Sequence, residues 1–126
     1  MTPSLRTALL AAALLPAGAA LAEGNAELNR ILEANASAAA FARICDEEPM
    51  SEQLKSSTMM LLAVNGLGPQ IVQLGSAKFN DVMRREIAGF RTAKDVDCPA
   101  RVKEARERLS FTHAIIQAGR RDAPSN

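Results

Sequence analysis

The chain has 126 residues, and its 15 Lys and Arg nearly balance its 14 Asp and Glu. The chain is thus not basic enough to suggest a nucleic-acid-binding domain. The absence of Trp and Tyr removes the usual aromatic platforms on which nucleotide bases stack. The length allows one small domain with a hydrophobic core of its own.

The first 22 residues have the three parts of an export signal. Arg6 supplies a positive charge, residues 7–15 form a mostly apolar stretch, and Ala20-Leu21-Ala22 has the small residues that a signal peptidase needs. The apolar stretch is too short for a bilayer, which takes about 20 residues, so an uncleaved anchor is the weaker alternative. We expect cleavage after Ala22, a bacterial periplasmic or secreted protein, and no membrane anchor.

Helical periodicity runs through the remainder of the chain. We therefore expect an all-α fold, with a bundle of about four helices over residues 23–119 and a flexible tail at 120–126. The first predicted helix begins at the N-cap Asn25 and ends near Cys45, because the sequence Asp-Glu-Glu-Pro at 46–49 stops it.

Two further helices are predicted in the middle of the chain. Ser51 is the expected N-cap of the second, which ends at Gly66, a residue suited to the left-handed C-cap position. The third runs from Pro69 to about Phe90. Gly75 lies within it, and we expect the helix to kink or divide there.

The two cysteines, Cys45 and Cys98, lie at helix boundaries far apart in the sequence. Cys98 opens the last predicted helix, which begins near the cap Asp97 and ends at Gly119. Two cysteines in a small exported chain are most simply one disulfide. The alternative is a reactive thiolate at Cys98, since a helix N-terminus lowers the pKa of a thiol, but no second cysteine lies two residues away.

Charge is distributed unevenly along the chain. Residues 23–77 carry three basic and seven acidic side chains, whereas residues 78–126 carry eleven basic and seven acidic ones. Two interpretations remain open: the halves attract each other within the bundle, or the molecule presents an acidic and a basic face to partners.

No motif predicts catalysis, a cofactor or a metal site. The one histidine, His113, lies on an apolar stripe without a recognisable nucleophile or carboxylate, so we expect it to be packed or hydrogen-bonded in the core. The methionines, which include the adjacent Met59 and Met60, lack the spacing of a Cu(I) site and are expected to fill gaps in the core. We therefore expect a protein that is not an enzyme.

The expected architecture resembles that of small periplasmic helical proteins with one long-range disulfide, such as HdeA-type acid-stress chaperones and small immunity proteins. The resemblance rests on export, size, helix content and the distant pair Cys45 and Cys98, and no family motif assigns roles to residues. It implies a binding protein rather than an enzyme.

The sequence thus favours a small exported helical protein that acts by protein–protein interaction, as a chaperone, an inhibitor or immunity protein, or an accessory subunit. The partner would be another periplasmic protein, and no nucleic acid is involved. The expected contact surface combines the glycine-rich stretch 65–75 with the charged last helix: Leu67, Ile71, Val72, Leu74, Arg101 and Arg108. The alternative is a periplasmic carrier of a small apolar ligand or a soft metal, and an enzyme with an unrecognised site comes third.

Overall fold

A computed structural model describes residues 26–90 and 95–122, with side chains as far as Gly119. These residues form four helices, α3 (Ala26–Ile44), α4 (Glu48–Val64), α5 (Pro69–Phe90) and α6 (Cys98–Asp122). The all-α prediction is therefore confirmed for this part of the chain. The predicted signal peptide, residues 1–22, lies outside the described residues. None of the four helices is both long and apolar enough to cross a membrane.

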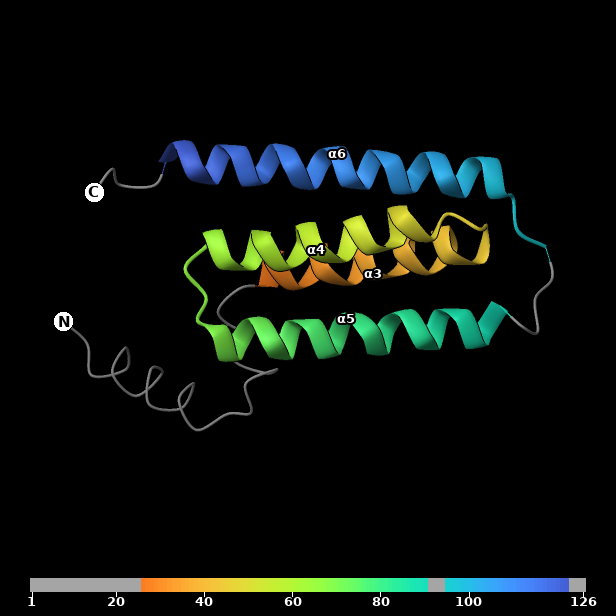
Figure 1. Cartoon of the computed structure of the whole chain (residues 1–126), viewed down its shortest axis with the longest axis horizontal. Coiled ribbons are helices and arrows are strands. Elements are labelled where there is room, and N and C mark those ends of the chain that lie inside the picture. Colours follow the sequence, from red (N-terminus) through yellow and green to blue (C-terminus); the bar gives the residue numbers. More distant parts are fainter. Residues whose placement is uncertain (1–25, 91–94, 123–126) are drawn as a thin grey trace.

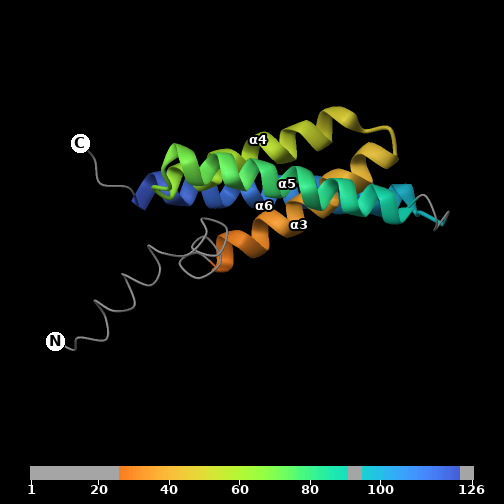
Figure 2. The same cartoon turned by 90° about the horizontal axis from the view of Figure 1, so that it is seen from below.

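The helices run alternately up and down, and α3 and α4 form the middle of the bundle (Figure 1). Each of the outer helices, α5 and α6, packs against both α3 and α4, whereas α5 and α6 do not touch each other. Viewed at right angles, α3 and α4 are inclined to each other and meet at the turn that joins them (Figure 2). The outer helices are therefore separated by the central pair.

α3 contacts all three other helices, and small residues cover much of its surface. Its buried alanines are Ala36, Ala38, Ala39, Ala40 and Ala42. These small side chains let the neighbouring helices pack closely on α3. Larger side chains fill the rest of the core, with Leu32, Leu54, Leu61, Leu62 and Phe79 fully buried. Each such side chain contributes about 1.5–3 kcal/mol to folding by leaving water.

The end of α4 has the predicted glycine cap. Gly66 has a φ of 82°, and the N–H groups of Gly66 and Leu67 donate to the carbonyl oxygens of Ala63 and Leu62 at 3.0 and 3.3 Å. This pair of bonds is the Schellman motif, which satisfies carbonyl groups that the helix itself leaves unpaired.

The end of α3 has the same bonds around an aspartate. The N–H groups of Asp46 and Glu47 donate to the carbonyl oxygens of Arg43 and Ala42 at 3.2 and 2.7 Å, and Asp46 has a φ of 63°. A left-handed conformation costs a residue with a side chain more than it costs glycine. The aspartate also places a carboxylate next to the negative end of the helix dipole.

Asp46→Gly is accordingly expected to raise the free energy of unfolding by about 0.5–1 kcal/mol, since it removes the backbone strain and the unfavourable charge. The neighbouring substitution Glu47→Gly is the control, because Glu47 has an ordinary φ of −111°. It should destabilise the protein or leave it unchanged. Urea unfolding of both variants tests this, and equal effects at the two positions would contradict it.

The start of α4 differs from the prediction. The helix begins at Glu48, with Pro49 in its first turn, where proline is tolerated because the first N–H groups have no helical partner. Ser51 therefore is not the cap. It is buried inside the helix, and its hydroxyl donates to Met83 Sδ at 3.6 Å. The Asp-Glu-Glu-Pro sequence ends one helix and also begins the next.

The predicted division of the third helix is wrong, because α5 continues from Pro69 to Phe90. Gly75 is buried within it, and a Cβ atom at this position would lie 2.6 Å from Leu62 Cδ1 and 3.4 Å from Leu32 Cδ1. The glycine therefore serves close packing of α5 on α3 and α4.

Gly75→Ala is expected to lower the free energy of unfolding by about 1 kcal/mol. Alanine gains about 1 kcal/mol in helix propensity, but overpacking against two fully buried leucines costs about 1–3 kcal/mol. Gly119→Ala in α6 is the matched control, since its Cβ would make only an ordinary contact of 3.8 Å with Val64 Cγ2. It should stabilise the protein, and thermal unfolding that shows the same sign for both would contradict the packing argument.

The last helix begins as predicted. Asp97 Oδ1 accepts a hydrogen bond from the Ala100 N–H at 3.2 Å, which is the bond of an N-cap. Its predicted end is wrong, because α6 continues through Gly119 to Asp122. Glycine lowers helix propensity without ending a helix.

The predicted disulfide joins the end of α3 to the start of α6. The sulfur atoms of Cys45 and Cys98 are 2.09 Å apart, and the Cα atoms are 5.6 Å apart. Beside it, the Phe41 and Phe90 rings pack edge to face with centroids 4.6 Å apart. This end of the bundle is therefore tied together by a covalent bond and an aromatic contact.

Candidate functional site

The predicted contact surface falls into separate regions. Leu67 and Val72 are half-buried and pack against the core, Ile71 is half-buried, and Leu74 is 41% exposed. These residues lie at the end of the bundle where α4 joins α5 (Figure 1). Ile71, Val72 and Leu74 lie on α5, which makes no contact with α6, so the structure does not bring these three residues together with the last helix.

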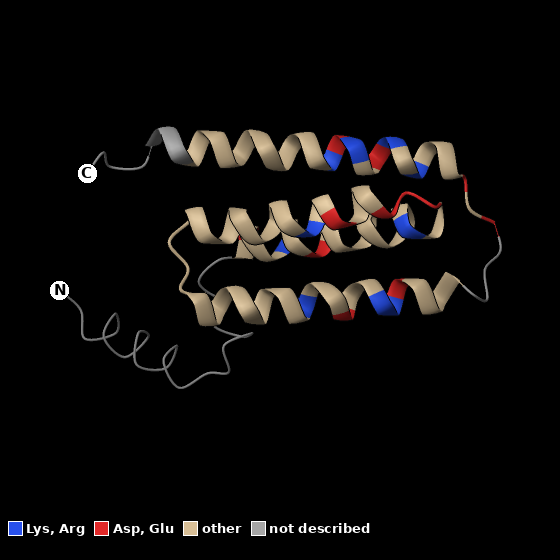
Figure 3. Ribbon diagram, in the orientation of Figure 1, with Lys and Arg blue, Asp and Glu red and all other residues tan. Residues whose placement is uncertain are grey.

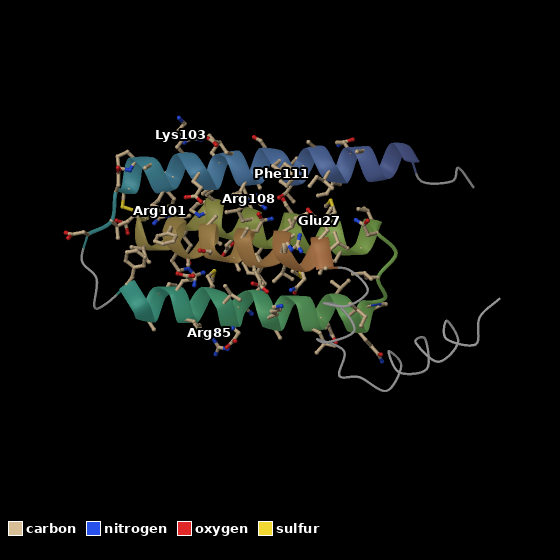
Figure 4. The ribbon with its side chains drawn as sticks, turned by 180° about the vertical axis from the view of Figure 1, so that it is seen from behind. Glu27, Arg85, Arg101, Lys103, Arg108 and Phe111 are labelled. Atoms are coloured by element: carbon tan, nitrogen blue, oxygen red, sulfur yellow. A yellow bond between two sulfur atoms is a disulfide. The ribbon has the colours of Figure 1, made fainter. Side chains whose placement is uncertain are left out.

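The two predicted arginines hold the bundle together. The Arg101 guanidinium lies 3.9 Å from the centroid of the Phe41 ring and 3.2 Å from Glu104 Oε2. Arg108 Nε donates to Asn35 Oδ1 at 2.9 Å, and its guanidinium lies 5.0 Å from the Phe111 ring. Figure 4 shows both arginines on the side of α6 that faces the bundle, whereas Lys103 points outward.

Asn35 is the centre of a buried polar network that joins α3, α4 and α6. Its Nδ2 donates to Thr58 Oγ1 at 2.9 Å and to Thr112 Oγ1 at 2.8 Å. The two hydroxyls donate in turn to carbonyl oxygens within their own helices, those of Leu54 and Arg108. Asn35, Thr58 and Thr112 are fully buried. Every polar group of this cluster therefore has a partner, as a buried network requires.

Arg108 reaches this network from the surface. Burial lowers the pKa of its guanidinium, and the nearby Glu104 carboxylate acts in the opposite direction. An arginine keeps its charge in proteins despite such a shift. Its role here is to satisfy the amide oxygen of Asn35 with a charge-assisted hydrogen bond.

His113 contacts a hydroxyl that sequence reasoning did not identify. Ser57 Oγ lies 2.9 Å from His113 Nε2, across the α4–α6 contact. The histidine is hydrogen-bonded as predicted, but it is exposed rather than in the core. Within the described residues no third group orients the ring, and Ser57 lies in mid-helix, where backbone N–H groups are already bonded. The pair therefore lacks the carboxylate and oxyanion donors of a hydrolytic site.

Metal ligands are likewise scattered. Among residues 26–90 and 95–119, no group of three or more His, Cys, Asp or Glu side chains could hold a metal ion. Two of the methionines do come together, since Met59 from α4 and Met83 from α5 line the same surface hollow. Sequence spacing gave no sign of this pair, because the two residues come from different helices.

That hollow is the main part of a groove between α4 and α5, which we call the α4–α5 groove. This hollow has a volume of about 490 Å³ and is lined by Arg43, Ser51, Glu52, Lys55, Ser56, Met59, Asn80 and Met83. Two adjoining hollows extend it along α5, past Ala77 and Arg84 to Ile87 and Ala88. Arg43, at the end of α3, lines all three hollows. The three hollows therefore adjoin one another, the first between α4 and α5 and the other two between the end of α3 and α5.

Cations predominate in the α4–α5 groove. Arg43, Lys55 and Arg84 line it, against the single carboxylate of Glu52. Arg43 forms an exposed ion pair with Glu48 at 3.6 Å, and Arg84 forms one with Asp81 at 3.6 Å. Such exposed pairs contribute little, about 0–1 kcal/mol, so both arginines remain available to another anion. In the part of the chain that the structure describes, Lys55 and Asn80 have no side-chain partner.

The charge pattern separates the two ends of the bundle. Over α4, α5 and α6, the described charged side chains lie in the half nearer the disulfide (Figure 3). The opposite half includes the uncharged segment 56–77, with Met60 and Leu74 exposed. The two halves of the sequence do attract each other at one point, where Lys78 of α5 lies 3.1 Å from Glu33 of α3.

Comparison of the chain with protein-family models, curated proteins and solved structures found no match.

Proposed function

We propose that the mature chain is an exported, non-enzymatic protein that acts by binding another periplasmic protein, as a chaperone, an inhibitor or immunity protein, or an accessory subunit. The observation that carries the proposal is the open α4–α5 groove. Its thioethers, cations and amide come from three helices that pack on one another, so the fold presents them together. A rigid, preorganised surface binds with a smaller entropic cost than a flexible one.

The export signal supports the proposed compartment. Loss of residues 1–22 is the expected processing, so intact-mass measurement on the exported protein should find a chain that begins at Glu23. A full-length chain that stays in the cytoplasm would contradict this part of the proposal.

Affinity capture from periplasmic extract tests the binding role. The disulfide-bonded protein should enrich one discrete partner at neutral or at acidic pH. The Cys45→Ser/Cys98→Ser variant, which cannot form the disulfide and is expected to be less stable, serves as a comparison: a partner of the folded surface should be enriched no more strongly by the variant than by the wild type. Recovery of no specific partner at either pH would count against the proposal.

A carrier is the second candidate, and one observation favours it. Met59 and Met83 line one hollow, and thioethers are ligands for soft metals such as Cu(I) and adaptable surfaces for apolar ligands. A carrier should retain its cargo during purification without tags. Native mass spectrometry and metal analysis would show the added mass, whereas the protein-binding role predicts the mass of the chain alone.

A further inference from the structure

We propose that the partner presents an acidic amphipathic helix, which binds lengthwise in the α4–α5 groove. This inference rests on the proposed protein-binding function and names the surface and the kind of partner. Three features of the groove support it: its length, its excess of cations and its thioether lining.

The length of the groove suits a helical segment. Its lining along α5 extends from Ala77 to Ala88, which corresponds to about 16 Å at the helical rise of 1.5 Å per residue. A helix of three turns has this length. Small-molecule sites usually enclose most of their ligand, whereas a groove open along one side matches the recognition of an amphipathic helix.

The charges of the groove select an acidic partner. Lys55 has no ion-pair partner among the described residues, and the pairs of Arg43 and Arg84 with their own neighbours are long and exposed. Carboxylates on both flanks of a bound helix would meet cations from α4 on one side and α5 on the other. Like charges would repel a basic helix, which provides specificity as well as attraction.

The apolar stripe of the bound helix would lie between the two methionines. Met59 is half-buried and Met83 is mostly buried, so each presents part of a flexible thioether to the groove. Flexible methionine side chains adapt to leucine or other apolar side chains without a preformed pocket. The uncharged Ser51, Ser56 and Asn80 complete the lining.

Two synthetic peptides test the proposal directly. Both have 14 residues, capped ends and leucine at helical i, i+3, i+4 and i+7 spacing, and they differ only in carrying Glu or Lys on the flanks. Each is titrated into the oxidised protein labelled at the methionine methyl groups, and NMR follows Met59 and Met83, with Met60 as the reference outside the groove. The acidic peptide should shift the two groove methyl signals, and the basic peptide should not.

Charge reversal in the groove provides the matched variants. The double variant Lys55→Glu/Arg84→Glu should bind the acidic peptide with an affinity about tenfold or more below that of the wild type. It should also bind the basic peptide, which the wild type should not bind. The control is Arg85→Glu, because Arg85 pairs with the same Asp81, at 2.9 Å, but does not line the groove. Figure 4 shows Arg85 on the outer side of α5, away from the other helices. This variant should bind the acidic peptide as the wild type does.

The gain of basic-peptide binding keeps the test decisive even if the double variant is less stable. Equal binding of both peptides, shifts at Met60 alone, or no shift with either peptide would overturn the proposal. Its failure is separable from that of the proposed function. If the wild type captures a specific partner and the double variant still recovers it, the binding role is supported and the groove is rejected as its site. If the acidic peptide binds but no partner is captured, the groove is supported as a helix-binding surface and the proposed binding role is not.

Discussion

Removal of the Cys45–Cys98 disulfide is expected to lower the free energy of unfolding by about 4 kcal/mol. The bond closes a loop of 53 residues, and in the chain-entropy model a loop of this length restricts the unfolded chain by that amount. A loss of this size is a large share of the stability of a typical domain, which is about 5–15 kcal/mol. The effect should come mostly from the unfolded state, so the helices themselves should persist.

Urea unfolding followed by circular dichroism measures this loss. The wild type in reductant and the Cys45→Ser/Cys98→Ser variant should show the same lowered midpoint, while the variant should not respond to reductant. The native helical signal should change little in either sample. An unchanged midpoint after reduction would contradict the stabilising role of the bond.

Asn35→Leu is expected to lower the free energy of unfolding by about 3 kcal/mol. The substitution removes three side-chain hydrogen bonds at a fully buried position, one of them to a charged group. The two threonine hydroxyls still donate to helix carbonyls, so the main penalty falls on Arg108, whose Nε loses its acceptor.

A double-mutant cycle separates this penalty from simple repacking. Arg108→Met removes the charge that Asn35 satisfies, so the combined Asn35→Leu/Arg108→Met variant should lose about 1–2 kcal/mol less than the sum of the single losses. Thr112→Ser and Thr112→Val provide a matched comparison for the hydrogen bond that Thr112 accepts from Asn35, because only Thr112→Ser keeps the hydroxyl group. Additive single losses in the cycle would show that the two residues are not coupled.

The elements of the fold were predictable where local chemistry decides them. The glycine cap at Gly66, the cap at Asp97 and the pairing of the two cysteines follow from short sequence patterns, and the structure confirms all three. Asn35, Thr58 and Thr112 lie on buried helix faces, where they meet in the core. Their mutual bonds were not predictable, since they depend on how three helices meet.

The errors have a common cause, which is packing between helices. Ser51 has the chemistry of a cap but is buried against Met83, and Gly75 has the chemistry of a break but allows close approach to Leu62. Gly119 lies within α6, where the helix continues past it. In each case a tertiary contact or a continuing helix outweighed the local preference of the residue.

The α4–α5 groove was beyond sequence reasoning for the same reason. Its lining comes from three helices, and its depth depends on how closely α4 approaches α5. The predicted surface at Leu67, Ile71, Val72 and Leu74 remains a second candidate at the uncharged end, and it shares no residue with the lining of the groove.

Photo-crosslinking in living cells tests the binding role of the groove most directly. A photoreactive phenylalanine analogue is placed at Ser56, an exposed position in the groove, and at Ala114, an exposed position on α6. Irradiation should join the Ser56 variant to one periplasmic protein with an acidic amphipathic helix and leave the Ala114 variant unjoined. A specific product from Ala114 but not from Ser56, or no product from either, would contradict the binding role of the groove.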